Sequence, residues 1–577
     1  MEHPGVRHYN QGVPSSCEYP DSTLPELLRL SSSRFPNTPA VLFYGNQINY
    51  FELTDLVTRF ALFLYKIGVR RGDRVAIMLP NIPQAIIGYY GALAVGATVV
   101  QTNPLYLERE LEIQLRDSGA ETILALDLFY PRIQCIQDRT AVRRIILTSV
   151  RDFLPPVKRL LYPIKAKLNG RWICVKAAPS LYDFKDAVKG PPHHRGATDV
   201  LPAVSPDDLA LLQYTGGTTG TPKGVMLTHR NVIANATQCR AWVPDFKDGQ
   251  EIFLGVIPFF HVYGLSTCQH LAIMTASTLV LLPRFQVTEV LAAIARHRVT
   301  IFSAIPMMFM KITEFSKVYR YDLRSLRVCL SGASPLHAEV QDRFERLTGV
   351  KISEGYGLTE AGPVTHCNPV YGDGPVGSIG VPFPDTEARV VDLETGEHVL
   401  PVGEAGELTV RAPQIMQGYW NNELETRAIL RDGWLYTGDI VREDPSGFFF
   451  LLDRKKDMIK TRGESVYPRE VEEVLFRHPA VKDVVVAGMP HRQFGEAVKA
   501  YVVLQDGHTV SESDLITHCR LSLAAFKVPL EIAFRQDLPR TLIGKVLRRA
   551  LQNEETENIR IEEQPLRPRE HSAVGGA

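Results

Sequence analysis

The chain has 577 residues, and its 64 Lys and Arg residues balance 64 Asp and Glu residues, so the formal net charge is zero. This balance argues against a protein that binds nucleic acid through its overall charge. With 45% hydrophobic and 22% charged residues, the composition is that of a globular chain and excludes disordered and collagen-like classes. The length excludes a single small module.

The N-terminal half alternates between predicted strands and predicted helices. Residues 40–50 predict a hairpin, and apolar residues at helical spacing predict a helix over 53–64. Buried strands are expected at 74–80 and 98–103, with a helix over 81–94 between them. The same alternation returns over 289–306, which predicts that most of the chain has an α/β fold.

The C-terminal third differs in texture. From about residue 371, short β-rich pieces with glycine turns predict a β subdomain that closes the large unit. A charged crossing follows, and then a helix and two strands predict a compact α+β unit. We therefore expect an N-terminal domain over 1–455, a C-terminal domain over 456–555 and a polar tail over 556–577.

Residues 143–176 form a basic segment, with nine Lys or Arg residues against one acid, Asp152. Its aromatic and leucine content suits contact with anionic lipid headgroups. The alternative is an ordinary solvated face, which the prolines favour because they interrupt any long amphipathic helix. Both interpretations stay open.

The cysteines and the N-terminus indicate a compartment. The eight cysteines are far apart, without metal-like spacing, so we expect reduced and mostly buried thiols. The N-terminus lacks the pattern of a secretory signal, and no stretch reaches about 18 uninterrupted apolar residues. A cytoplasmic protein is expected.

A phosphate loop is the sharpest motif. Residues 215–224 read TGGTTGTPKG, between a strand-like run and a run interpreted as a helix. Glycines let backbone N–H groups approach a phosphate, threonine hydroxyls add donors, and Lys223 supplies a cation. It is not a Walker A sequence, because Pro222 and Gly224 stand where that motif requires Gly and Ser or Thr. The alternative is a flexible Gly/Thr linker.

The string YTGGTTGTPKG resembles the core signature of the acyl-adenylate-forming (AMP-binding) superfamily, and Gly216 in place of Ser resembles its bacterial long-chain fatty acyl-CoA synthetases. Six further motifs that resemble those of the family follow in the same order: PFFHVYGL (258–265), SGASPL (331–336), EGYGLTE (354–360), GWLYTGDI (433–440), DRKKDMIKTRGESVYPREVE (453–472) and PRTLIGKVLRR (539–549). The resemblance implies an α/β fold, with two α/β subdomains and a distorted β-barrel in the large domain and a small mobile α+β C-terminal domain.

The resemblance implies an ATP site in which Tyr356 stacks on adenine and Asp439, with Arg454, binds the ribose. Glu360 and Thr215 are the expected Mg²⁺ ligands. Taken alone, EGYGLTE could equally be a strand end with a glycine turn, and Asp439 a turn aspartate. The implied ATP-binding residues are Thr215, Gly216, Gly217, Thr218, Thr219, Gly220, Lys223, Gly332, Ala333, Ser334, Tyr356, Gly357, Thr359, Asp439 and Arg454.

The resemblance also implies the catalytic groups Lys545, Lys460, Glu360 and His261, although each lysine alone would be an ordinary surface residue. Lys456 is the implied hinge. The implied acyl pocket holds His261, Val262, Tyr263 and Gly332, and the implied coenzyme A site holds Lys460, Arg462, Gly463 and Glu464.

These motifs together predict a long-chain fatty acid-CoA ligase that uses ATP, Mg²⁺ and coenzyme A. Alternatives are a ligase for medium-chain or aromatic carboxylates, acyl transfer to a carrier protein, or a nucleotide-binding protein without catalysis. A homodimer is expected, with no nucleic-acid partner and with peripheral contact at the inner membrane face as an open question.

Overall fold

The computed structural model describes residues 3–170, 173, 175, 178–189, 199–215, 222–372, 374–462, 464–491, 493–540, 547–548 and 550–555. The chain forms two compact units: a large unit of Met1–Thr437 with Val441–Leu451, and a small unit of Gly438–Ile440 with Leu452–Ala577. The boundary expected at residue 455 stays a prediction, and the expected tail lies outside the described residues.

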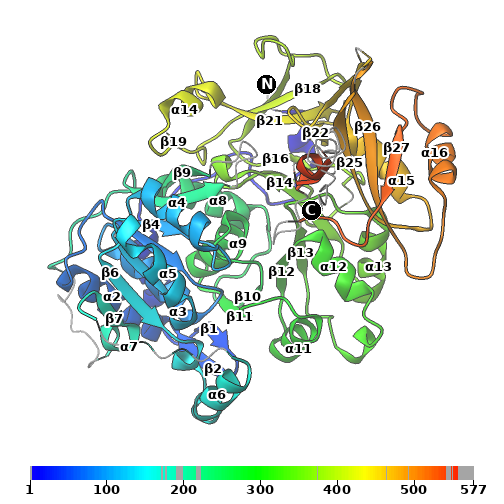
Figure 1. The fold of residues 1–577 in the computed structure, drawn as a ribbon. Helices are drawn as coiled ribbons and strands as arrows, with labels where there is room; N and C mark the ends of the chain where they lie inside the picture. The colour runs from blue at the N-terminus through cyan, green and yellow to red at the C-terminus, as the bar shows by residue number, and fades with distance from the viewer. Residues whose placement is uncertain are drawn as a thin grey trace, which may run out of the picture. The chain divides into compact units, whose positions relative to one another are not determined.

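The first sheet of the large unit has nine strands. In spatial order they are β16 (Val381–Pro382), β15 (Val364–Cys367), β14 (Ile352–Gly357), β13 (Val328–Ser331), β12 (Ile301–Ala304), β10 (Ile252–Gly255), β11 (Thr278–Leu281), β1 (Pro39–Phe43) and β2 (Asn46–Asn49). The strands from β14 to β1 are parallel. A core that includes Phe302, Phe309 and Phe344 joins this sheet to helices α11 (Val287–His297), α12 (Pro306–Thr313) and α13 (Ala338–Thr348) (Figure 1).

The second sheet has eight strands. In spatial order they are β19 (Gly418–Tyr419), β9 (Lys223–Thr228), β8 (Leu209–Thr215), β4 (Thr98–Gln101), β3 (Arg74–Met78), β5 (Thr122–Leu126), β6 (Arg144–Thr148) and β7 (Leu181–Asp183). The other helices of these two α/β layers are α1 (Leu24–Arg34), α2 (Tyr50–Lys66), α3 (Pro83–Ala94), α4 (Glu108–Ser118), α5 (Tyr130–Ile136), α7 (Phe184–Ala187), α8 (His229–Ala241), α9 (Val262–Gly264) and α10 (Leu271–Met274). The predicted hairpin at 40–50 and the alternation that follows it are confirmed.

The expectation that prolines prevent an amphipathic helix in the basic segment is wrong. Helix α6 runs for 13 residues, Pro156–Leu168. Pro156 occupies the first turn, where the missing N–H has no intrahelical partner to lose, and Pro163 is accommodated inside the helix.

A third sheet follows in sequence, with β17 (Glu387–Val391), β18 (Ala405–Arg411), β21 (Trp434–Glu443) and β20 (Leu430–Arg431) in order, and β22 (Phe449–Arg454) beside β21. Helix α14 (Glu423–Ile429) lies before β20 in the chain.

The small unit has its own sheet and core. Its strands are β24 (Glu464–Val466), β23 (Ile459–Thr461), β26 (Gly495–Leu504), β25 (Val481–His491) and, beside β26, β27 (Glu531–Phe534), with helices α15 (Pro468–Phe476) and α16 (Glu512–Arg520). Val471, Leu475, Val486 and Leu515 pack in one apolar cluster between these helices and the sheet. Across the described part of the chain, no helix is both long and apolar enough to cross a membrane.

Candidate active site

The phosphate loop connects two antiparallel strands. Thr215 at the end of β8 lies opposite Lys223 at the start of β9, and residues 216–221 between them are outside the described residues. The expectation that a helix follows the loop directly is wrong. Residues 223–228 pair with β8 as a strand that buries Val225 and Leu227, and α8 begins only after Thr228, whose side chain caps it.

Lys223 is held by side chains that the sequence did not single out. Its Nζ lies 2.6 Å from Glu425 Oε2 and 5.1 Å from the centre of the Tyr419 ring. Strand β19 brings Tyr419 there by pairing with β9, and Asn422 then caps α14, which carries Glu425. An acidic side chain thus pairs with the cation that is expected to bind phosphate.

The same cluster includes the expected metal ligand. The Tyr419 hydroxyl donates to Glu360 Oε1 at 2.7 Å. Burial and the negative charge of Glu360 raise the pKa of Tyr419 well above its ordinary value, so the hydroxyl keeps its proton and stays a donor. We call this group the phosphate cluster: Lys223, Glu360, Tyr419 and Glu425.

Glu360 suits a divalent cation that also binds phosphate. No described residue donates a hydrogen bond to its second oxygen, Oε2, and the side chain is half-buried. Mg²⁺ is usually bound by one or two carboxylates together with substrate phosphates. No group of three or more His, Cys, Asp or Glu side chains with metal-binding geometry occurs among the residues that the structure describes.

The expected adenine site lies at the end of β14. Tyr356 is buried and meets His366 edge-on, with 5.9 Å between ring centres. Burial lowers the pKa of His366 to about 3, so its ring is neutral. Gly357 is required by packing, because a Cβ there would lie 1.9 Å from the Pro363 carbonyl oxygen. Ala333 has a φ of +71°, a strained conformation of the kind that clusters at functional sites.

The residues of the expected acyl pocket lie together in the large unit. His261 caps α9, where its Nδ1 accepts a hydrogen bond from the Tyr263 N–H at 3.3 Å. The Tyr263 hydroxyl is 3.3 Å from the Ala304 carbonyl oxygen and 3.2 Å from that of Leu330. A Cβ on Gly332 would lie 3.3 Å from the Tyr263 ring, so a side chain at this position would crowd it. Val262 is buried beside them.

The expected ribose pair is also brought together, within the small unit. Asp439 is 2% exposed, and the Arg454 Nε lies 3.0 Å from its Oδ1. A carboxylate with an arginine beside it can accept hydrogen bonds from two hydroxyls.

The described residues expected to bind coenzyme A share one exposed hairpin. Strands β23 and β24 pair with Lys460 opposite Ser465 and Thr461 opposite Glu464. Arg462 at the tip has a φ of +55°. Its guanidinium lies 4.0 Å from the centre of the Phe494 ring. Gly463 and the expected catalytic Lys545 are outside the described residues.

A partly buried charge cluster around Arg548 anchors the segment that follows Lys545. Arg548 Nη2 lies 2.7 Å from Glu472, and Nη1 lies 3.3 Å from Asp457 and 3.7 Å from Asp453. Burial raises the pKa of Asp453 to about 6, although the Arg548 charge opposes this shift. Asp453 and Asp457 lie on either side of the expected hinge residue Lys456 in the sequence, so one arginine pairs with acids on both sides of it.

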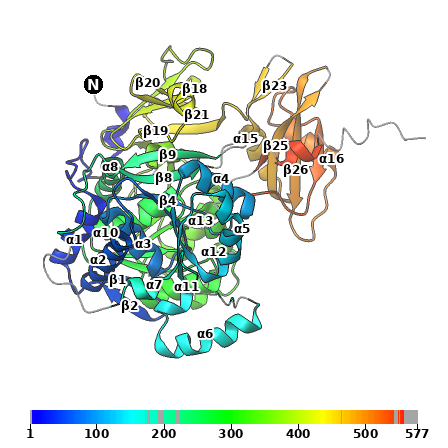
Figure 2. The same cartoon turned by 60° about the vertical axis from the view of Figure 1, so that its left-hand side comes forward.

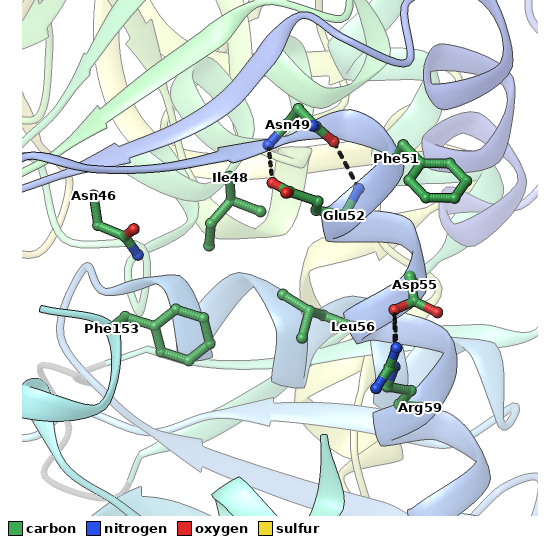
Figure 3. A pocket seen from close by; sticks show the side chains of 9 residues that line it. All are labelled: Asn46, Ile48, Asn49, Phe51, Glu52, Asp55, Leu56, Arg59 and Phe153. Carbon is green, nitrogen blue, oxygen red and sulfur yellow. Dashed lines mark hydrogen bonds and ion pairs between the residues drawn. The ribbon is translucent and has the colours of Figure 1, made fainter. Parts of the chain in front are cut away.

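A cavity of about 500 Å³ in the large unit includes none of the expected site residues (Figure 3). Four of its five polar side chains pair with each other: Asn49 and Glu52 exchange hydrogen bonds that cap α2, and Arg59 lies 2.6 Å from Asp55. The lining is Asn46, Ile48, Asn49, Phe51, Glu52, Asp55, Leu56, Arg59 and Phe153.

Two family models match most of the chain. The AMP-binding enzyme model matches residues 28–420, and the AMP-binding enzyme C-terminal domain model matches residues 470–545. The chain belongs to the AMP-binding enzyme family. A long-chain-fatty-acid–CoA ligase of Bacillus subtilis is 45% identical over 97% of this chain and 99% of its own length.

Other known proteins are similar to the chain in sequence or structure. A 4-coumarate–CoA ligase of Solanum tuberosum is 31% identical over 92% of this chain and 95% of its own length. The crystal structure of ATP-bound MatB from Rhodopseudomonas palustris has a TM-score of 0.82 at 27% identity, over 93% of this chain and 100% of that one. These likenesses confirm the predicted fold class of a large α/β N-terminal domain with a small C-terminal domain.

Three residues with structural ties to the site were missed. Tyr419 and Glu425 lie in GYWNNELETR, where the only local signal is an Asn cap followed three residues later by Glu. Nothing in the sequence connects that helix start with a lysine about 200 positions earlier. Arg548 belongs to a motif that was recognised, but the three acids that surround it come together only in the folded small unit.

Proposed function

We propose that this chain is a long-chain fatty acid-CoA ligase. It activates a fatty acid with ATP to give acyl-AMP and pyrophosphate, and then transfers the acyl group to the thiol of coenzyme A with release of AMP. The observation that carries the proposal is the 45% identity to a long-chain-fatty-acid–CoA ligase across nearly the whole of both chains.

In the first step, the carboxylate oxygen of the fatty acid attacks the α-phosphorus of ATP, and the bond from that phosphorus to the pyrophosphate oxygen breaks. Lys223 leaves Glu425 to bind the polyphosphate, and Lys545 stabilises the negative charge that builds up in the transition state. Glu360 and Thr215 would hold Mg²⁺, which supplies further neutralisation of phosphate charge. No side-chain nucleophile is required.

Nucleotide and acyl chain are positioned by separate groups. Tyr356 contacts the adenine, which Gly332, Ala333, Ser334, Gly357 and Thr359 border, and Gly216, Gly217, Thr218, Thr219 and Gly220 cradle the phosphates. Asp439 and Arg454 bind the ribose. His261, with Val262, Tyr263 and Gly332, lines the acyl site, and its Nδ1 is oriented by the Tyr263 N–H.

In the second step, the thiol sulfur attacks the acyl carbon and AMP leaves. We assign the hairpin residues Lys460, Arg462, Gly463 and Glu464 to coenzyme A, and Lys456 to the hinge about which the small unit reorients between steps. The exposed position of Lys460 supports its assignment to an incoming substrate. The division at 455 into two domains, with the tail from 556, belongs to this proposal.

The setting of the reaction is also proposed. We place the enzyme in the cytoplasm, at the inner face of the membrane from which its substrate is drawn, as a homodimer without a nucleic-acid partner. The balanced charge of 64 basic and 64 acidic residues supports the last point.

A coenzyme A ligation panel tests the substrate class. Purified protein receives ATP, Mg²⁺, coenzyme A and one acid from a series from acetate to oleate, with 4-coumarate and cinnamate as aromatic acids. The expected result is the highest kcat/KM at long chains. A best substrate shorter than about eight carbons, or an aromatic best substrate of the kind that the 31% identical relative is named for, would overturn the long-chain assignment.

A further inference from the structure

Helix α6 presents a row of apolar side chains to solvent. Val157, Leu160, Leu161, Ile164 and Leu168 are 72%, 77%, 55%, 60% and 82% exposed. Figures 1 and 2 both place the helix at the edge of the large unit, beyond β2. Large apolar side chains grouped at such exposure mark an interaction site on a folded protein.

The row is one continuous face. At 3.6 residues per turn, the five side chains fall within an arc of about 100°. Ala166, which is buried against the rest of the unit, lies opposite the centre of that arc. The helix therefore already uses one side for its own fold, and the apolar side points away.

Basic side chains border the apolar face. Lys158 and Lys165 lie along one edge and Lys167 along the other, as the helical spacing requires. Lys158 is fixed there by its Nζ, which donates to the Tyr44 carbonyl oxygen at 2.8 Å. The sequence contains no Asp or Glu between Asp152 and Asp183. The apolar stripe suits a partner with an apolar interior. Its cationic edges, with no acidic residue nearby in the sequence, suit a partner with an anionic surface.

We propose that α6 binds the surface of an anionic lipid bilayer, with its apolar face among the upper acyl chains and its lysines at the phosphate level. This is the geometry of an interfacial amphipathic helix that lies in the plane of the membrane. Charge complementarity selects this occupant over a second copy of the chain, because two copies of α6 face to face would oppose their basic edges.

Vesicle co-sedimentation tests the proposal without substrates, so its outcome is independent of the ligase assignment. The full chain is mixed with vesicles of phosphatidylcholine alone or with phosphatidylglycerol at a third of the lipid. Binding is expected only with phosphatidylglycerol, and is expected to weaken as salt rises from about 0.1 to 0.5 M. Absence of binding to phosphatidylglycerol vesicles at low salt would overturn the proposal.

Variants separate α6 from the rest of the surface. Leu160→Asp with Ile164→Asp should lower the partition coefficient at least about tenfold, and Lys165→Glu with Lys167→Glu should do so by a comparable factor. Leu521→Asp is the matched control, since Leu521 is 82% exposed in the small unit, and it should bind like the wild type. Unchanged thermal unfolding of each variant establishes folding.

Two outcomes would contradict the assignment to lipid. Equal binding by the wild type and both α6 variants would place the membrane contact elsewhere. Loss of self-association in the Leu160→Asp and Ile164→Asp variant by sedimentation velocity, without any change in lipid binding, would assign the face to a second copy of the chain.

Discussion

The large and small units organise their charged groups in opposite ways. In the large unit, the phosphate cluster joins segments that are far apart in sequence, and an acid within it already neutralises Lys223. In the small unit, the expected coenzyme A residues sit on one short exposed hairpin, while three acids, of which Asp453 is buried, gather around Arg548. The large unit thus holds its expected phosphate-binding lysine in an ion pair, and the small unit holds its expected coenzyme A residues exposed on a hairpin.

The largest expected effect concerns the two lysines assigned to the small unit. Lys545→Ala should slow acyl-AMP formation about 10²–10³-fold, the usual cost of losing one preorganised charge stabiliser, and leave thioester formation from supplied acyl-AMP nearly unchanged. Lys460→Ala should do the reverse. Each half-reaction is measured by quench-flow, and equal loss of both steps in either variant would contradict the division of labour.

Within the large unit, Tyr419 should act through Glu360. Glu360→Gln should lower the adenylation rate about 10²-fold and raise the Mg²⁺ concentration needed for half-maximal rate. Tyr419→Phe removes only the hydrogen bond to Glu360 Oε1. We therefore expect an adenylation rate about tenfold lower than that of the wild type, together with a changed Mg²⁺ concentration for half-maximal rate. If the rate falls and the Mg²⁺ dependence does not change, Tyr419 does not act through Glu360 and has only a structural role.

Glu425 should compete with ATP for Lys223. Glu425→Gln removes the competing charge, so the KM for ATP should fall a few-fold with little change in kcat. Glu423→Gln is the control on the same helix, because Glu423 pairs with Arg427 and not with Lys223. An increase in KM for ATP in Glu425→Gln alone would show instead that the acid holds Lys223 in its working position.

An effect separate from catalysis is a pH dependence of the stability of the small unit. Burial raises the pKa of Asp453 from 3.8 to about 6, so folding favours its neutral form. Its contribution to stability is fully present below the pKa of the unfolded chain and is lost as pH rises through about 6. The unfolding free energy of the wild type should therefore fall between pH 4 and 6, and in Asp453→Asn this fall should be smaller by on the order of 2 kcal/mol.

This change is measured by urea unfolding of the full chain, with hydrogen exchange at β25 and β26 as the readout for the small unit. Asp506→Asn serves as the control, since the Asp506 side chain is 99% exposed. The same slope in the wild type and in Asp453→Asn would show that Asp453 titrates as an ordinary carboxylate.

Much of the fold could be predicted because its signals are local. The helix over 53–64 and the strand at 74–80 follow from apolar spacing, and the structure has α2 and β3 there. The strand after the phosphate loop was mistaken for a helix, since GVMLT alone does not reveal that β8 lies beside it. Helix α6 forms although Pro163 lies inside it, and only Pro156 stands in the first turn, where a proline costs little.

In the candidate site, too, the residues with local sequence signals could be predicted and the others could not. Thr215, Lys223, Glu360 and Tyr356 belong to ordered motifs, so residue type and order were enough to nominate them. Glu425 and Tyr419 became neighbours of Lys223 only through the pairing of β19 with β9, a contact between distant segments. Their partnership is a property of the tertiary fold, which a single sequence does not encode in any local pattern.

A rapid-quench experiment without coenzyme A tests most directly whether the protein forms acyl-AMP from a fatty acid. With oleate, ATP and Mg²⁺, pyrophosphate and oleoyl-AMP should form in amounts close to the enzyme concentration, and AMP should be released when coenzyme A is added. Release of phosphate and ADP, or nucleotide cleavage that does not depend on the carboxylate, would contradict acyl-AMP formation.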